Sequence, residues 1–375
     1  MNADRAIAAR KLGQSLWYDN ISRMLLRSGE LRELVSSGII TGITTNPTIF
    51  HKAIESSEAY DSAIRGLLDR GLAPLEIYNE LTLDDVAEAA DLLRPVHDSS
   101  EGADGHISLE VRPSLANDAD GTVEEGRALF TRLHRPNVMI KVPGTAAGVV
   151  AFQRLTEAGV NVNVTLLFSA RQYEAIARSY VAALRARERR KEPVRTLASV
   201  ASFFVSRVDT VVDAELERIA KGREDSRATV ARSLLGKTGV ANCKVAYRRF
   251  QELFGADFDD LRKAGARPQR MLWASTGTKN PQYSDVMYVD PLLGPSTVNT
   301  MPPATLKAFL DHGNTAASTV AREVDVAQAS LESLKSLGID LDRVCAKLQE
   351  DGVTLFQSSF DALIGALSKK ALVKG

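Results

Sequence analysis

Eight short apolar runs, separated by longer segments with helical periodicity, limit the folds open to this chain of 375 residues. Regular alternation of strand and helix favours βαβ units with parallel strands. Eight such units close a (β/α)₈ barrel, and the chain is long enough for a TIM barrel with additional helices. The expected strands are residues 15–19, 39–45, 106–111, 138–142, 161–168, 197–208, 270–276 and 285–290.

The remaining segments are expected to be mainly helical. Residues from Pro302 onward are predicted to form helices that pack on the barrel or over its mouth, and further helices are expected near 183–196 and 221–240. No proline-rich or glycine-rich linker divides the chain, so we predict a single domain over residues 1–375. An open doubly wound sheet is the alternative, but no GxGxxG motif follows the first strand.

Charge and cysteine content argue against several classes of protein. Lys plus Arg and Asp plus Glu both total 47, so nothing favours nucleic-acid or membrane-surface binding. Two widely spaced cysteines and five histidines without HxH or HxxxH spacing predict a reducing compartment and no metal site. The chain has neither the apolar run of a signal peptide nor that of a membrane span. We therefore expect a cytoplasmic protein that does not bind membranes or nucleic acid.

The segment NVMIKVPGT, residues 137–145, places one lysine, Lys141, inside an apolar strand. An apolar neighbourhood disfavours the ammonium form of a lysine and leaves a nucleophilic amine. Enzymes use such an amine to form a Schiff base with a carbonyl substrate. The alternative for this segment alone is an edge strand whose lysine extends its charge to water.

The faces of the predicted strands decide between these alternatives. Side chains alternate along a strand, and helices cover the outside of a barrel, so polar faces are expected to point into the lumen. One such buried group is usually structural, but a lysine with two carboxylates, amides and a hydroxyl is the set that Schiff-base aldol chemistry requires. The side chains expected in the lumen are Asp19, Asn46, Glu110, Lys141, Asn163 and Thr165.

Three segments resemble signatures of the transaldolase family: GITTNPTIF (42–50), the lysine segment through the fifth run (138–169), and GPSTVNTMP (294–302), placed after the last strand. The resemblance extends from about Asp19 to the C-terminal helices. It implies a class I aldolase-type barrel without metal or organic cofactor. Its expected substrates are sugar phosphates, and its expected state is a monomer or homodimer.

Such an enzyme moves a dihydroxyacetone unit from sedoheptulose 7-phosphate or fructose 6-phosphate to glyceraldehyde 3-phosphate or erythrose 4-phosphate, in the non-oxidative pentose phosphate pathway. By resemblance, Lys141 forms the Schiff base with the ketose C2. Glu110 acts through a water held by Thr165, and Asp19 takes the proton of the C4 hydroxyl. The implied substrate-binding residues are Asn46 and Asn163 for the hydroxyls, Ser202 and Phe204 in the same pocket, and Arg207, Ser275 and Lys279 for the phosphate.

The sequence departs from the family pattern at a few of these positions. Lys279 stands where arginine is usual, and Phe203 and Ser206 replace a proline and a glycine. Phe204 stands where related fructose-6-phosphate aldolases carry tyrosine, which favours transfer over simple cleavage. The alternatives are an aldolase that releases free dihydroxyacetone and a non-catalytic barrel that serves as a binding scaffold.

One further motif, ARSLLGKT (231–238), fits a relaxed phosphate-binding pattern. A true P-loop follows a buried strand, but the residues before this motif are highly charged. We therefore predict the end of a helix, with Gly236 as the stop.

Overall fold

A computed structural model of the chain describes residues 3–372, and it contains a closed barrel of eight strands. The strands follow one another around the barrel in chain order, and every neighbouring pair is parallel. The predicted (β/α)₈ fold class is therefore confirmed. The strands are β1 (Gln14–Tyr18), β2 (Gly42–Thr44), β3 (His106–Glu110), β4 (Val138–Pro143), β5 (Val162–Leu167), β6 (Ser199–Phe204), β7 (Arg270–Ala274) and β8 (Thr297–Met301).

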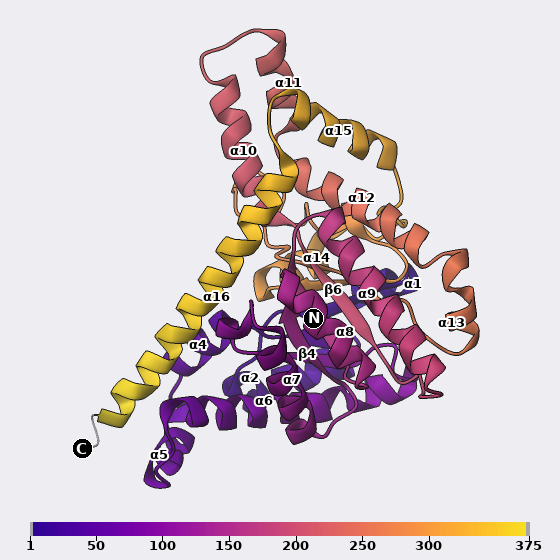
Figure 1. Ribbon diagram of the computed structural model, residues 1–375. Coiled ribbons are helices and arrows are strands. Elements are labelled where there is room, and N and C mark those ends of the chain that lie inside the picture. The colour runs from indigo at the N-terminus through magenta and orange to yellow at the C-terminus, as the bar shows by residue number, and fades with distance from the viewer. Residues whose placement is uncertain (1–2, 373–375) are drawn as a thin grey trace.

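Helices surround the barrel, and the last of them runs along one side of the molecule next to α4 (Figure 1). Across the described residues, none of the helices combines the length and the apolar character that a membrane crossing requires. The helices are α1 (Asp4–Lys11), α2 (Arg23–Ser28), α3 (Glu30–Ser36), α4 (Pro47–Glu55), α5 (Asp61–Asp69), α6 (Pro74–Ser99), α7 (Ala119–Leu133), α8 (Ala146–Glu157), α9 (Ala170–Arg189), α10 (Ser206–Ala220), α11 (Ser226–Leu234), α12 (Thr238–Leu253), α13 (Asp259–Lys263), α14 (Pro303–His312), α15 (Val324–Ser336) and α16 (Leu341–Leu372).

The lumen contains an apolar layer beneath its polar mouth. Trp17 lies in this layer, where it packs in one cluster with inward-facing side chains of other strands. Gly42 makes room for it, because a Cβ atom at that position would lie 2.4 Å from the indole ring. The other inward-facing members of this layer are Met139, Val200, Leu272 and Val298.

The prediction of a strand at residues 285–290 is wrong. The eighth strand is Thr297–Met301, which lies within the segment 294–302 that is predicted to follow the last strand. The 285–292 segment instead covers the outside of β7 and β8, where Leu292 O accepts a hydrogen bond from Trp273 Nε1 at 3.0 Å. Val289 and Leu292 are fully buried there. A covering segment and a strand both require apolar residues, so the pattern alone did not separate them.

Three smaller features also differ from the predictions. The sixth strand ends at Phe204, so Arg207 lies in the first turn of α10 rather than in a strand. A bulge interrupts β5, and Leu166 adopts a left-handed backbone with φ of 59°. This bulge turns the Leu166 side chain toward Gly352 of α16, although strict alternation would place it among the outward-facing residues of β5. Residues 313–323, between α14 and α15, are not helical.

The P-loop-like segment 231–238 lies at the junction of α11 and α12, and its prediction as a helix end is confirmed. Gly236 follows α11 with φ of 68°. The backbone N–H groups that could have bound a phosphate are occupied by the protein's own carboxylates. Gly236 N donates to Asp213 Oδ1 at 2.9 Å, and Gly239 N donates to Asp209 Oδ1 at 2.7 Å.

Candidate functional site

A cavity of about 290 Å³ opens at the carboxyl ends of the strands, which is where barrel enzymes hold their chemistry. All of the residues predicted for the site line this cavity except Glu110 and Asn163, which lie directly behind it. The predicted residues that line it are Asp19, Asn46, Lys141, Thr165, Ser202, Phe204, Arg207, Ser275 and Lys279.

Lys141 lies near the end of β4, between Glu110 of β3 and Asn163 of β5 in the strand register. Its Nζ is 3.2 Å from Glu110 Oε2 and donates a hydrogen bond of 2.9 Å to the carbonyl of Thr45. Lys141 and Glu110 are 4% and 8% exposed. The expected apolar neighbourhood of the lysine is therefore wrong, because the neighbours along β4 point outward while those across the lumen are polar.

Asp19 follows β1 and faces the same space. Its Oδ1 accepts a hydrogen bond of 2.6 Å from Thr44 Oγ1, and the Thr44 hydroxyl also lies 2.6 Å from that of Thr300. Burial raises the pKa of the Asp19 carboxyl and of the Glu110 carboxyl above their ordinary values. The charge of Lys141 opposes both shifts but does not cancel them. Two carboxylates with raised proton affinity therefore surround one buried amine.

Amide groups occupy two different positions around this centre. Asn46 caps α4 through its Oδ1, which accepts from Ile49 N at 3.0 Å, so its amide nitrogen remains available at the cavity. Asn163 is fully buried. It accepts from Ser202 Oγ at 2.7 Å and donates to Ser108 Oγ at 2.9 Å. Asn163 therefore holds Ser202 in place, and Ser202 is the one that lines the cavity.

Two buried polar atoms beside the lysine have no aligned hydrogen-bond partner among the described residues. They are Glu110 Oε2 and Thr165 Oγ1. Glu110 Oε2 is close to Lys141, but the hydrogen bond of the ammonium goes to Thr45 O. Buried polar groups are rarely left unpaired, and such groups are found where a ligand or water binds.

The other end of the cavity is cationic. Arg207 lies over the Phe204 ring, with 5.2 Å between its guanidinium carbon and the ring centre. Burial lowers the pKa of its guanidinium, and no carboxylate pairs with Arg207 or Lys279 in the described part of the chain. Ser275 adopts a left-handed backbone with φ of 54° at the end of β7, where its hydroxyl lies 2.9 Å from that of Ser206. Unpaired cations and a strained serine at a cavity are consistent with an anion site.

Several residues of the cavity were not predicted from the sequence. Leu355 and Phe356 come from α16, and the centre of the Phe356 ring is 5.7 Å from Lys141 Nζ. Lys52 comes from α4, six residues after Asn46. Helical periodicity shows that α16 is amphipathic, but it does not show which barrel opening the helix covers. For Lys52, the sequence signal is its position on the same predicted helix, about two turns after the TNP segment.

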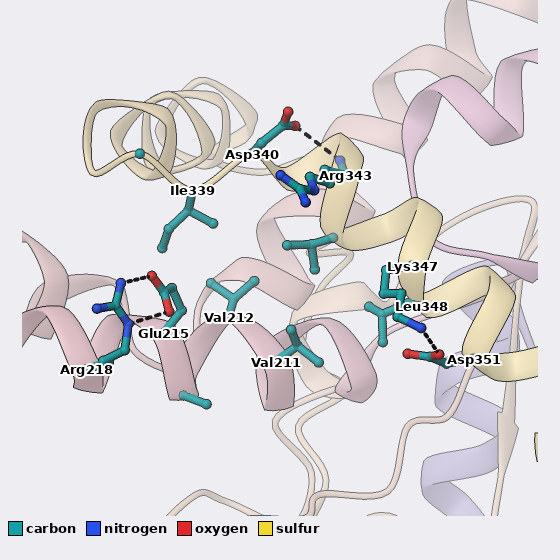
Figure 2. Close-up of a pocket in the computed structure, with 13 residues that line it drawn as sticks. Val211, Val212, Glu215, Arg218, Ile339, Asp340, Arg343, Lys347, Leu348 and Asp351 are labelled. Atoms are coloured by element: carbon teal, nitrogen blue, oxygen red, sulfur yellow. Dashed lines mark hydrogen bonds and ion pairs between the residues drawn. The ribbon is translucent and has the colours of Figure 1, made fainter.

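A second cavity, of about 720 Å³, lies outside the barrel between α10 and the start of α16 (Figure 2). Its floor contains Val212 and Leu348, and its charged residues are mostly paired with each other, as Glu215 is with Arg218 and Lys347 with Asp351. None of the predicted site residues lines it. The chemistry of the protein is therefore placed in the smaller cavity at the barrel mouth.

Fold and site together define a class of (β/α)₈ barrel with a buried lysine, flanked by two carboxylates, at the carboxyl ends of its strands. Residues 3–372 contain no cluster of three or more His, Cys, Asp or Glu side chains placed to hold a metal ion. The model of the transaldolase/fructose-6-phosphate aldolase family matches residues 16–367. The chain belongs to this family.

Individual relatives match over almost their whole length. A protein named transaldolase from Thiobacillus denitrificans is 46% identical over 358 residues, which cover 95% of this chain and 98% of the relative. One from Thermobifida fusca is 44% identical over 359 residues, with 96% of both chains covered. Another from Trichodesmium erythraeum is 40% identical over 374 residues, with 99% and 98% covered.

Proposed function

We propose that this protein is a transaldolase that acts through a Schiff base on Lys141. The observation that carries the proposal is the group of Lys141, Glu110 and Asp19 in one cavity with cations at its other end. The relatives named transaldolase, similar over the full length, support the same activity. The substrates are then ketose and aldose phosphates such as fructose 6-phosphate and erythrose 4-phosphate.

Schiff-base formation begins with a proton transfer. Glu110, 3.2 Å from Nζ and with a raised pKa, accepts the proton that Lys141 must lose before it attacks the ketose C2. The carbinolamine then loses water and becomes an iminium ion. The free acceptor positions of Glu110 and Thr165 suit them to hold that water as it leaves and later returns.

Cleavage of the carbon–carbon bond requires a base at the C4 hydroxyl. Asp19 has a raised pKa and is held by Thr44, so it takes this proton as the C3–C4 bond breaks. The electron pair of that bond moves into the iminium, which leaves a dihydroxyacetone enamine on Lys141 and releases an aldose phosphate. Addition of the enamine to a second aldose reverses these steps, and Asp19 returns the proton to the new hydroxyl.

The binding roles follow from the positions of the side chains. The amide nitrogen of Asn46 and the hydroxyl of Ser202 suit the hydroxyls of the dihydroxyacetone unit, with Asn163 positioning Ser202. Arg207, Ser275 and Lys279 suit the phosphate, because a guanidinium forks onto its oxygens and a lysine adds a point charge.

The family also includes aldolases that release free dihydroxyacetone. Phe204 favours transfer, because its ring offers no hydroxyl that could assist protonation of the enamine. Rates measured with fructose 6-phosphate in the presence and absence of erythrose 4-phosphate distinguish the two activities. A non-catalytic scaffold is disfavoured, because two carboxylates and an amine buried in an otherwise packed barrel are costly for stability.

Borohydride trapping with fructose 6-phosphate tests the proposal. The peptide that carries Lys141 should gain the mass of a reduced dihydroxyacetone adduct, and the Lys141→Met variant should gain none. Lys244 is a matched internal control, because its buried Nζ also donates to a carbonyl, that of Arg322, at 2.8 Å. Lys244 lies on α12 outside the barrel and should remain unlabelled. Folded wild-type protein without label at Lys141 would sink the proposal.

We also infer that the chain acts as one domain, since α16 packs against α4, α6, α10 and β5 of the same barrel. A cytoplasmic location and a monomeric or homodimeric state remain predictions. Cell fractionation checks the location, and sedimentation velocity checks the oligomeric state.

A further inference from the structure

One face of α16 is built to lie on the barrel. Buried positions recur along this helix at intervals of three or four residues, as expected for a single contact stripe. The stripe begins where Cys345 Sγ contacts Phe168 O at 3.0 Å and continues to the C-terminal end of the described chain. The buried members of the stripe are Cys345, Leu348, Gly352, Phe356, Phe360, Leu363 and Leu367.

Polar contacts set the position of the helix on both sides of Phe356. Gln349 Nε2 donates to Gly144 O and to Leu166 O, both at 2.9 Å, at the carboxyl ends of β4 and β5. Thr48 Oγ1, on α4, lies 2.9 Å from Ser359 Oγ. These contacts hold α16 across the side of the barrel mouth between α4 and β5, as its path beside α4 in Figure 1 shows.

Gly352 allows a close approach one turn before Phe356. A Cβ atom at Gly352 would lie 2.8 Å from the Leu166 side chain and 3.6 Å from Arg207 Nη1. A larger residue would therefore have to displace the Leu166 side chain at the end of β5. The absence of a side chain at Gly352 leaves room for Leu166 beneath the helix.

The side chains that α16 brings to the cavity are apolar. They are Leu355 and Phe356, whereas the strands contribute carboxylate, amide, hydroxyl and ammonium groups. Phe356 is 4% exposed, and the centre of its ring is 5.7 Å from Lys141 Nζ. A carbon bonded to Nζ would therefore lie beside an aromatic surface that offers no proton donor and displaces water.

We propose that Phe356 determines how the three-carbon adduct on Lys141 is released, and this inference rests on the transaldolase function proposed above. Two reactions compete for the enamine. In transfer, its C3 attacks the aldose carbonyl carbon, a C–C bond forms, and the new alkoxide takes a proton from Asp19. In the side reaction, C3 takes a proton, water adds to C2 of the resulting iminium, the C–N bond breaks, and free dihydroxyacetone leaves Lys141 as the amine.

Phe356 suppresses the side reaction because that path needs a proton at C3, which solvent water supplies, whereas in transfer C3 bonds to the aldose carbon instead. Both paths end when the water held by Glu110 and Thr165 hydrolyses an iminium at C2, so the ring discriminates at C3 and leaves that water in place. Exclusion of water from a reactive intermediate is a recognised use of a closed active site. The hydrogen bonds of Gln349 and Ser359 act only by holding α16, and with it the Phe356 ring, beside the adduct. The residue thus determines specificity between transfer and release without taking part in the chemistry.

The test compares Phe356→Ala and the milder Phe356→Val with the wild type. Each protein receives fructose 6-phosphate with and without erythrose 4-phosphate, and free dihydroxyacetone and sedoheptulose 7-phosphate are quantified. The ratio of free dihydroxyacetone to transfer product should rise at least about tenfold in Phe356→Ala and by a smaller factor in Phe356→Val. Circular dichroism checks that each variant is folded. If Phe356→Ala does not fold, the product ratio of Phe356→Val alone decides the test.

Leu348→Ala is the matched control. Leu348 also lies buried on α16, but its side chain borders the groove toward α10 rather than the reaction cavity (Figure 2). Its truncation weakens the packing of the helix to a similar extent and should leave the product ratio at the wild-type value. A ratio that changes equally in Leu348→Ala, or that stays unchanged in a folded Phe356 variant, overturns the inference.

Borohydride trapping separates this inference from the proposed function. An unlabelled Lys141 in the wild type refutes the Schiff-base function itself. A labelled Lys141 in wild type and variants, together with a constant product ratio, refutes only the role of Phe356.

Discussion

Asp209 gives the most quantitative prediction, because its burial makes the stability of the protein depend on pH. The side chain is fully buried on α10, two residues after Arg207, and its Oδ1 accepts from Gly239 N at 2.7 Å. Burial raises the pKa of its carboxyl from 3.8 to about 6, and the charge of Asp213 adds to the shift. The folded state therefore binds the proton more tightly than the unfolded state does.

The sign of the effect follows from this difference. Below both pKa values the carboxyl is neutral in both states and has no effect on stability. As the pH rises, the carboxyl ionises first in the unfolded state, which lowers the free energy of that state relative to the folded one. A shift from 3.8 to about 6 corresponds to about 3 kcal/mol of lost stability at high pH. About 1.4 kcal/mol of that loss falls between about pH 5 and pH 8.

The variant Asp209→Asn removes the titration and keeps an oxygen that can accept from Gly239. The free energy of unfolding of the variant minus that of the wild type should therefore increase by about 1.4 kcal/mol from about pH 5 to pH 8. Any constant packing cost of the amide cancels in this comparison. Guanidinium unfolding followed by circular dichroism measures it, under conditions where unfolding and refolding curves coincide.

Asp118→Asn is the control for this measurement. Asp118 also accepts from a backbone N–H, that of Gly121 at 3.0 Å, but it caps α7 in an exposed position. The difference between this variant and the wild type should stay flat over the same pH range. Parallel pH profiles for Asp209→Asn and the wild type would refute the reasoning, because they would mean that burial does not favour the protonated form.

Three further predictions concern the site and the base of the barrel. Glu110→Gln should lower kcat by about a hundredfold or more and slow borohydride labelling of Lys141, since the amine loses its proton acceptor, while the protein remains folded. An unchanged labelling rate would contradict the role of Glu110 as that proton acceptor. Arg207→Gln should raise KM for fructose 6-phosphate at least about tenfold, while Lys279→Arg should keep or lower it, because guanidinium forks onto phosphate; labelling by unphosphorylated dihydroxyacetone, which should be unaffected, is the control. His106 is buried with a pKa lowered to about 3, so the folded state holds it neutral and stability falls as the pH drops below about 6.5. Between about pH 7 and pH 5, the free energy of unfolding of His106→Phe should therefore fall by about 2 kcal/mol less than that of the wild type in the same unfolding assay. Equal falls in the two proteins would show that the ring is not held neutral.

The sequence by itself determined the barrel and most of its chemical groups. Strands whose outer face is covered by helices must be apolar on that face, so the polar residues of each strand had to face the lumen. That rule places Asp19, Glu110 and Lys141 together from the sequence alone. It holds because the alternation of side chains is a property of the strand backbone and does not depend on distant contacts.

Only the tertiary structure decided the features that depend on distant segments. The apolar run 285–290 is buried as a cover over β7 and β8, and Thr297–Met301 is the strand despite its polar residues. The ion pair of Lys141 replaced the expected apolar neighbourhood, because its partners come from other strands. Phe356 reaches the cavity from a helix more than two hundred residues after Lys141. Periodicity reports which face of a segment is buried, but the partner of that face is set by packing across the whole fold.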